Sequence, residues 1–139
     1  MTGQTNMRDY AIDQMNRLLT RLAFQVHRAA KTPGPGEIHD VRVSIRRFSQ
    51  GLLIFDSLLP KPEIKKIRKA LKGMMRLTSE IRNRDIALEF LMQAKHPRHQ
   101  PRLRKERAAY QRQFTELVRR WTAREFSAKW RNRLLLERL

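Results

Sequence analysis

The chain has no cysteine among its 139 residues. This absence excludes disulfides, thiolate metal sites and a cysteine nucleophile, and it suits a reducing compartment. Long apolar runs are also missing, and without about 18 consecutive apolar residues we expect no membrane-spanning helix. The opening stretch, MTGQTNMRDYAIDQMN, lacks a basic segment followed by an apolar block, which argues against a secretory signal. We therefore expect a cytoplasmic protein.

Acidic residues are scarce relative to basic ones. The chain has 13 Asp and Glu against 31 Lys and Arg, a formal net charge of +18. Self-repulsion on this scale opposes a compact fold unless a polyanion is the usual companion. The candidate companions are nucleic acid, an anionic membrane surface and inorganic polyphosphate. A solubilising surface coat is the other reading, but such a coat is often built from Lys and Glu together, and here the acids are too few.

Sequence signatures of catalysis are missing as well. The chain has no Gly-rich phosphate cradle, no G-x-S-x-G element and no evident carboxylate pair in a basic setting. His96 and His99 flank Pro97 with no carboxylate or cysteine beside them, which indicates a metal site only weakly. We expect a binding module rather than an enzyme, with no catalytic residue, no metal and no cofactor.

Helical spacing dominates the apolar pattern, and strand-type alternation does not occur. The spacing predicts helices over residues 7–31, about 37–58, about 62–91, and from 101 onward, with residues 123–139 either continuing the last helix or forming a short fifth one. Segments rich in Pro and Gly separate them, namely TPGPGE, LLP and KHPRHQP. The prediction is an all-α protein, an antiparallel four-helix bundle in a single domain over residues 1–139.

Two predicted helices carry basic faces. On the second helix, His39, Arg42 and Arg46 recur at i, i+3 and i+7 and share a face away from the apolar stripe, while Arg47 is displaced around the helix but still outside the core. On the third helix, a column of Lys and Arg repeats at helical spacing, formed by Lys65, Lys69, Lys72 and Arg76. Residues 61–76 hold seven basic residues and one acid, so like charges repel there and a bound polyanion would relieve the repulsion. A solvated lysine face is the alternative.

The residue types on these faces favour phosphate as the ligand. Arginine offers planar, bidentate donors to phosphate oxygens, lysine supplies compact charge, and histidine adds a ring N–H donor. Aromatic residues such as Phe48 and Phe55 fall in the apolar stripes instead of the basic faces. Because bases stack on aromatic side chains, this placement argues against a protein that binds single strands by stacking.

These residues also carry a family resemblance. The stretch IHDVRVSIRR, an LP break, and then LKGMMRLTSEIRNRDIALEFL resemble the conserved histidine α-helical domain, or CHAD, family. The family pattern is a His, an Arg three residues on and basic residues at seven and eight, which is matched by His39, Arg42, Arg46 and Arg47. The segment 82–86 fills the place of a later Arg-Asp element. The resemblance implies an all-helical, non-enzymatic protein that binds inorganic polyphosphate through basic residues lining a groove or pore.

Three departures from the family pattern shape further expectations. Ser49 stands where the family often has another basic residue, and Asn83 replaces a usual Asp. Family members usually have two related four-helix halves, whereas this chain has the length for one half of such a two-bundle architecture. We therefore expect two copies to pair as a homodimer and rebuild a two-sided basic groove. Arg82 and Asp85 are expected to be mainly structural, paired with each other or with neighbouring backbone.

Three hypotheses for function remain in competition. The first is a polyphosphate-binding module that holds phosphate chains without sequence readout, in the cytoplasm and in association with polyphosphate granules. Its predicted site comprises His39, Arg42, Arg46, Arg47, Lys65, Lys69, Lys72 and Arg76. The second is a nucleic-acid-binding protein that uses the same charge. The third is a scaffold whose helices dock a partner, and which would keep that partner without His39, Arg42 and Arg46.

Overall fold

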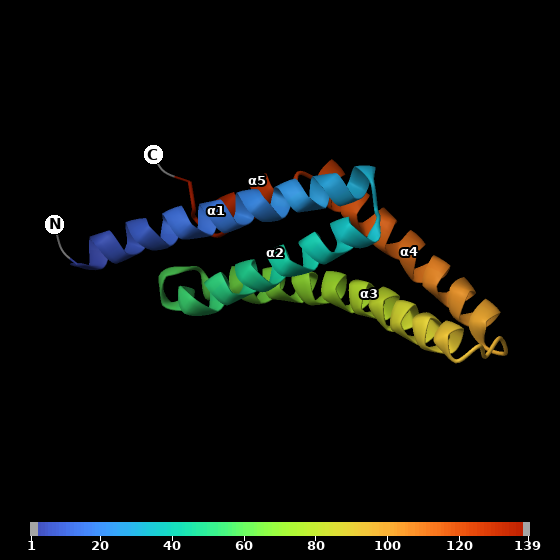
Figure 1. Cartoon of the computed structure of the whole chain (residues 1–139). Coiled ribbons are helices and arrows are strands. Elements are labelled where there is room, and N and C mark those ends of the chain that lie inside the picture. Colours follow the sequence, from blue (N-terminus) through green and yellow to red (C-terminus); the bar gives the residue numbers. More distant parts are fainter. Residues whose placement is uncertain (1–2, 138–139) are drawn as a thin grey trace.

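The computed structural model describes the backbone of residues 3–137 and the side chains of residues 6–137. Its elements are α1 (Gly3–Lys31), α2 (Pro35–Ile54), the 3-10 turn η1 (Asp56–Leu58), α3 (Lys61–Gln93), α4 (Gln100–Ala123) and α5 (Phe126–Arg133) (Figure 1). The prediction of an all-α protein is confirmed, and the described residues form no strand. None of the described helices is both long enough and apolar enough to cross a membrane.

The helix boundaries follow local chemistry. Prolines lie in the first turn of α2, α3 and α4, where a missing backbone N–H costs nothing. Glu125 has φ 51°, a left-handed conformation that ends α4 and lets α5 turn back. The stretch after residue 123 therefore forms a separate short helix, one of the two predicted outcomes, and residues 138–139 lie outside the described part of the chain.

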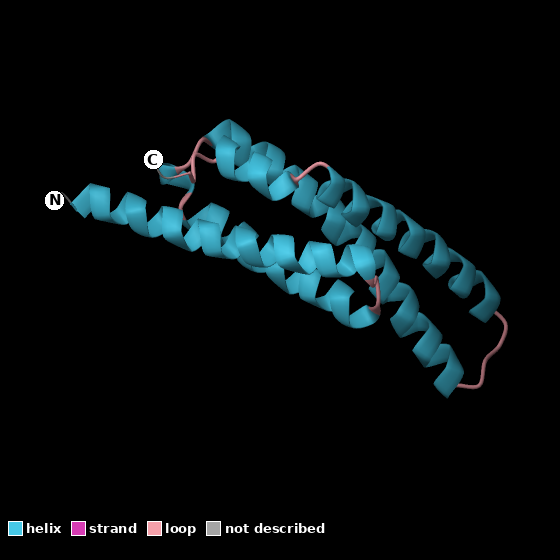
Figure 2. Cartoon of the chain, turned by 90° about the horizontal axis from the view of Figure 1, so that it is seen from above, coloured by secondary structure: helices cyan, strands magenta, loops and turns pink. Residues whose placement is uncertain are grey.

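Consecutive long helices run in opposite directions and pack side by side. Helix α1 packs on α2 and α4, α3 packs on α4 and α2, and α5 folds back onto α1 (Figures 1 and 2). The second half of α3 and the first half of α4 extend past the ends of α1 and α2. We call this projecting part, residues 84–110, the distal hairpin.

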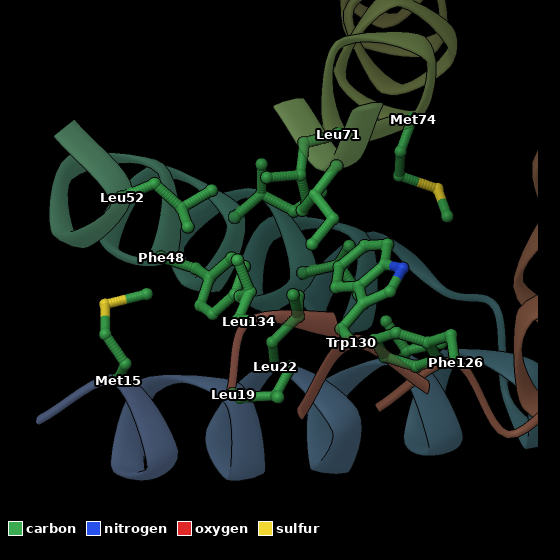
Figure 3. Packing of buried hydrophobic residues seen from close by; sticks show 14 of the residues in the cluster. Met15, Leu19, Leu22, Phe48, Leu52, Leu71, Met74, Phe126, Trp130 and Leu134 are labelled. Atoms are coloured by element: carbon green, nitrogen blue, oxygen red, sulfur yellow. The ribbon is translucent and has the colours of Figure 1, made fainter. Parts of the chain in front are cut away.

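The hydrophobic core lies among α1, α2, α3, α4 and α5, and part of it is shown in Figure 3. Leu19 and Leu22 of α1 and Phe48 of α2 are fully buried, and the Trp130 ring of α5 stacks on Phe48 with centroids 6.0 Å apart. A Cβ atom at Gly51 would come within 2.7 Å of the Met15 sulfur, so glycine permits the close approach of α1 and α2. This packing holds α2 firmly and leaves its other side free to meet α3.

Candidate functional site

Arg42 lies at the seam between α2 and α3. Its Nη1 donates hydrogen bonds to Thr78 Oγ1 at 2.7 Å, to Ser79 Oγ at 3.0 Å and, more weakly, to the Met75 carbonyl oxygen at 3.4 Å. The Thr78 hydroxyl in turn donates to that same carbonyl at 3.0 Å. The expectation that Arg42 points away from the core is therefore wrong, because α3 packs against that face of α2 and half-buries the side chain.

A pocket of about 450 Å³ opens beside this seam. We call it the arginine pocket. Its polar lining consists of His39, Arg42, Arg46, Thr78, Arg82 and Asp85, and its apolar lining consists of Pro35, Ile38 and Ile81. The structure thus brings together three residues that the sequence predicted as site residues and adds Arg82, which was expected to be mainly structural. The arginine–aspartate element of the family motif was the sequence feature that pointed to Arg82.

The guanidinium groups of this pocket lie close enough to repel one another. The pKa of Arg42 is lowered by burial and, further, by the positive charges of Arg46 and Arg82. In the part of the chain that the structure describes, no carboxylate forms an ion pair with any of these three arginines. A concentration of partly desolvated, uncompensated positive charge attracts anions.

Asp85 lines the pocket, but its carboxylate is already engaged. Arg107 of α4 contacts both of its oxygens, with Nη2 donating to Oδ2 at 3.5 Å and Nε donating to Oδ1. The expected pairing of Asp85 with Arg82 is therefore wrong. The reason is that α4 packs against α3 at this level and supplies a competing arginine, which leaves the Arg82 guanidinium exposed at the pocket.

A second basic hollow, of about 380 Å³, lies on the first half of α3. We call it the lysine hollow. It is lined by Lys61, Ile64, Lys65, Arg68, Lys69 and Lys72, so three of the predicted residues meet here and are joined by Lys61 and Arg68, which the column pattern did not include. Arg47 and Arg76 are exposed and line neither hollow. Their assignment to the site stays a prediction.

The two hollows lie along one side of α3. At about 100° per residue, Arg68, Lys72, Ser79 and Arg82 fall within about 80° of arc, and Lys72 and Ser79 are about 10 Å apart along the axis. Ser79 contacts Arg42 of α2, which places this side of α3 beside the basic face of α2. We call the surface from the lysine hollow to the arginine pocket the basic track.

The arginines of the distal hairpin have a different environment. Arg84 bonds to Glu80, lies 3.4 Å from a Glu106 oxygen, and stacks over the Tyr110 ring at 4.8 Å. Burial opposes the charge of Arg84, but the hydrogen bond and charge of Glu80 and the charge of Glu106 outweigh it and raise the pKa. A broad hollow of about 730 Å³ between α3 and α4 is lined by acids as well as bases, including Asp85 and Glu89 beside Arg104 and Arg107.

Metal-ligating groups are sparse in this structure. The His96 and His99 rings stack with centroids 6.4 Å apart at the turn between α3 and α4. No group of three or more His, Cys, Asp or Glu that is suited to hold a metal occurs among the described residues. The site is therefore defined by its cationic side chains and hydroxyls.

Comparison with known proteins gives a family for this arrangement. The family model described as CHAD domain matches residues 13–138, which extends the likeness from the motif-bearing helices α2 and α3 to α1, α4 and α5. Comparison with curated proteins and with solved structures gave no significant match. With a match over nearly its whole length, the chain belongs to the CHAD domain family.

Proposed function

We propose that this chain is an inorganic polyphosphate-binding module without enzymatic activity. The observation that carries the proposal is the convergence of Arg42, Arg46 and Arg82 with His39 on one pocket, where no carboxylate is ion-paired to these arginines among the described residues. The CHAD domain is associated with polyphosphate binding in general, which supports the same assignment.

The fixed position of Arg42 suits it to bind phosphate oxygens. Its hydrogen bonds to Thr78, Ser79 and Met75 all use Nη1. A guanidinium has five N–H donors, so Nε and Nη2 stay available for a ligand. Because α3 already holds the group in place, less side-chain entropy is lost when an anion binds. Arg42 would therefore act as an anchor, and Arg46 and Arg82 would add bidentate contacts.

The lysine hollow would hold the rest of the phosphate chain mainly by charge. Lys65, Lys69 and Lys72 are exposed ammonium groups on flexible stems, which attract phosphate oxygens without demanding one geometry. Such contacts release counterions from a polyanion and carry no sequence information. The proposal therefore combines a defined pocket with a less specific surface.

Pairing of two copies would add a second basic wall. Leu53 and Ile54, at the end of α2, are 60% and 69% exposed, and Ile86 and Phe90 are exposed farther along α3. Apolar groups that flank a basic surface on the same two helices suit a two-fold contact with a second copy. We propose a homodimer that a bound phosphate chain stabilises, located in the cytoplasm with polyphosphate granules. Light scattering with and without polyphosphate tests the dimer directly.

A competition titration near physiological salt tests the proposed function. Labelled long-chain polyphosphate is bound to the protein and displaced with unlabelled polyphosphate, duplex DNA or single-stranded RNA at equal phosphate concentration. We expect polyphosphate to displace the label at the lowest concentration. Equal displacement by nucleic acid would contradict a dedicated site and would favour a general polyanion-binding protein instead.

A matched pair of variants ties the result to the pocket. Arg46→Ala removes a charge from the arginine pocket, and Arg112→Ala removes an equal charge from an exposed position on α4. We expect only Arg46→Ala to reduce the preference for polyphosphate over nucleic acid. Equal effects of the two changes would mean that net charge, and no defined pocket, selects the ligand.

A further inference from the structure

The positive charge of the basic track stops abruptly along α3. Residues 61–84 carry the lysine hollow and the pocket arginine Arg82, but residues 85–94 contain no Lys or Arg and include Asp85 and Glu89. Asp85 lines the arginine pocket, and Glu89 lies one turn farther along the helix. Along α3, the side chains therefore change from basic, at the start of the track, to acidic just past the pocket.

The basic face of α2 ends at the same level as the basic residues of α3. His39 is the residue of the basic face nearest the start of α2, and the preceding residues 35–38 include Glu37 and no Lys, Arg or His. Pro35 lines the same pocket as Arg82 and Asp85, so the first turn of α2 lies beside the point on α3 where the basic residues stop. The two helices thus end the track together.

Apolar side chains also line the pocket. Ile38 is buried in the first turn of α2, Ile81 is buried on α3, and Pro35 completes this lining. The arginine pocket is more enclosed than the lysine hollow. An anionic chain that ran on past this end would leave the unpaired arginines of the pocket. It would meet Asp85 and Glu89 beside Arg104 and Arg107, where acidic and basic side chains offset one another.

We infer that the arginine pocket binds the terminal phosphate of a polyphosphate chain whose inner phosphates lie along the basic track. This inference rests on the proposed function. An end group suits the pocket because a terminal phosphate, like a phosphate monoester, carries up to two negative charges and offers three oxygens as acceptors. An inner phosphate carries one charge and is bonded to neighbours on both sides.

The hydrogen-bond donors of the three arginines suit the oxygens of a terminal phosphate. Arg42 is anchored through one nitrogen, and Arg46 and Arg82 reach the pocket from opposite helices, so donors surround the space from more than one direction. The three free oxygens of a terminal phosphate can accept hydrogen bonds from donors on several sides, whereas an inner phosphate has only two free oxygens. Past the pocket, Asp85 is paired with Arg107, so the excess of positive charge ends at the pocket, and this limit sets the direction of the bound chain.

Chains with blocked ends test the inference. Linear polyphosphate of one length is compared with the same chain after both terminal phosphates are converted to alkyl esters. Each is titrated into the protein by calorimetry. We expect blocking to weaken binding about tenfold, since the loss of one charge-assisted hydrogen bond has roughly that effect. In Arg82→Ala the difference between the free and blocked chains should shrink, because one of the three arginines that meet the end group is lost.

A second variant separates the end site from the track. Arg68→Ala removes one charge from the lysine hollow on the same side of α3, so it should weaken both chains while the ratio between them stays as in the unchanged protein. Equal binding of free and blocked chains to the unchanged protein would overturn the end site and leave the proposed function intact. A blocking effect that is undiminished in Arg82→Ala would also overturn it. Failure of both chains to bind would instead refute the proposed function.

Discussion

In the arginine pocket, Arg42, Arg46 and Arg82 form no ion pair with any carboxylate of the described residues. In the distal hairpin, by contrast, Arg84 and Arg107 are each held by carboxylates. Both regions lie on or against α3, and Arg82 and Arg84 are only two residues apart. On a helix, two residues are about 200° apart, so neighbouring arginines face different helices. Arg82 faces the pocket, and Arg84 faces α4 and its Glu106.

The contrast shows what decides the role of an arginine in this protein. A guanidinium whose charge is balanced within the fold stabilises the packing of α3 on α4 and has little left to offer a ligand. A guanidinium that is held in place only by hydroxyls and a carbonyl, as Arg42 is, keeps its charge for an external anion. Net charge alone does not distinguish the two, because every arginine contributes equally to the total of +18.

The largest expected effect on polyphosphate affinity comes from removing three side chains of the arginine pocket. Changing His39, Arg42 and Arg46 together to Ala removes most of its cationic lining. We expect the affinity for long-chain polyphosphate to fall roughly a hundredfold or more, because several charge-assisted hydrogen bonds are lost at once. Calorimetric titration at fixed salt measures the loss, and circular dichroism confirms folding. Retained affinity in a folded triple variant would show that the pocket is not the site.

Arg84→Ala should lower the stability of the fold and leave polyphosphate affinity nearly unchanged, which is the opposite of the result expected for the pocket variant. It removes the contacts with Glu80 and Glu106 and the stacking over Tyr110, and the side chain of Arg84 is only 21% exposed. We expect the free energy of unfolding, measured by urea denaturation, to fall by about 1–3 kcal/mol. Polyphosphate affinity of the folded variant should stay nearly unchanged. A large loss of affinity with normal stability would break the distinction between the two regions.

A single-site comparison sharpens the distinction. Arg46→Ala should weaken polyphosphate binding about tenfold, as expected for one charge-assisted contact. Arg107→Ala and Arg131→Ala should weaken it less, because Arg107 is paired with Asp85 and Arg131 donates to Asn16 Oδ1 at 3.0 Å. Side-by-side titrations at one salt concentration give the ratio. Equal losses at all three positions would indicate diffuse attraction.

The smallest effect is expected at Arg47. This residue is adjacent to Arg46 but exposed and outside the lining of either hollow. Its removal should lower affinity by no more than about twofold, through the loss of one solvated charge. The matched change Arg46→Ala is the reference. A loss at Arg47 as large as that at Arg46 would extend the site around α2 and support its place among the predicted site residues.

The helices and the core could be predicted because their determinants are local. Apolar residues at helical spacing and prolines at helix ends depend only on nearby sequence, and buried residues such as Leu19 and Phe48 follow directly from that spacing. The family motif likewise identified His39, Arg42 and Arg46, which all line one pocket.

The partners of the site residues depend on how helices pack, and this information is not local. The bond from Arg42 to Thr78 joins residues 36 positions apart and requires the register between α2 and α3. The pairing of Asp85 with Arg107 spans 22 positions and requires the register between α3 and α4. Helical spacing correctly separates the faces of one helix, but it does not reveal which face another helix will cover. For that reason, helical spacing does not predict that α3 half-buries Arg42 or that Arg82 lines the pocket.

The most direct test of the account observes the arginine side chains themselves. NMR spectra of the guanidinium Nε–H groups, recorded as polyphosphate is added, report which arginines meet the ligand. We predict the largest shifts at Arg42, Arg46 and Arg82, and little change at Arg84 and Arg107, whose carboxylate partners stay in place. Similar shifts at all arginines, or the largest shifts in the distal hairpin, would contradict the claim that unpaired arginines form the binding site.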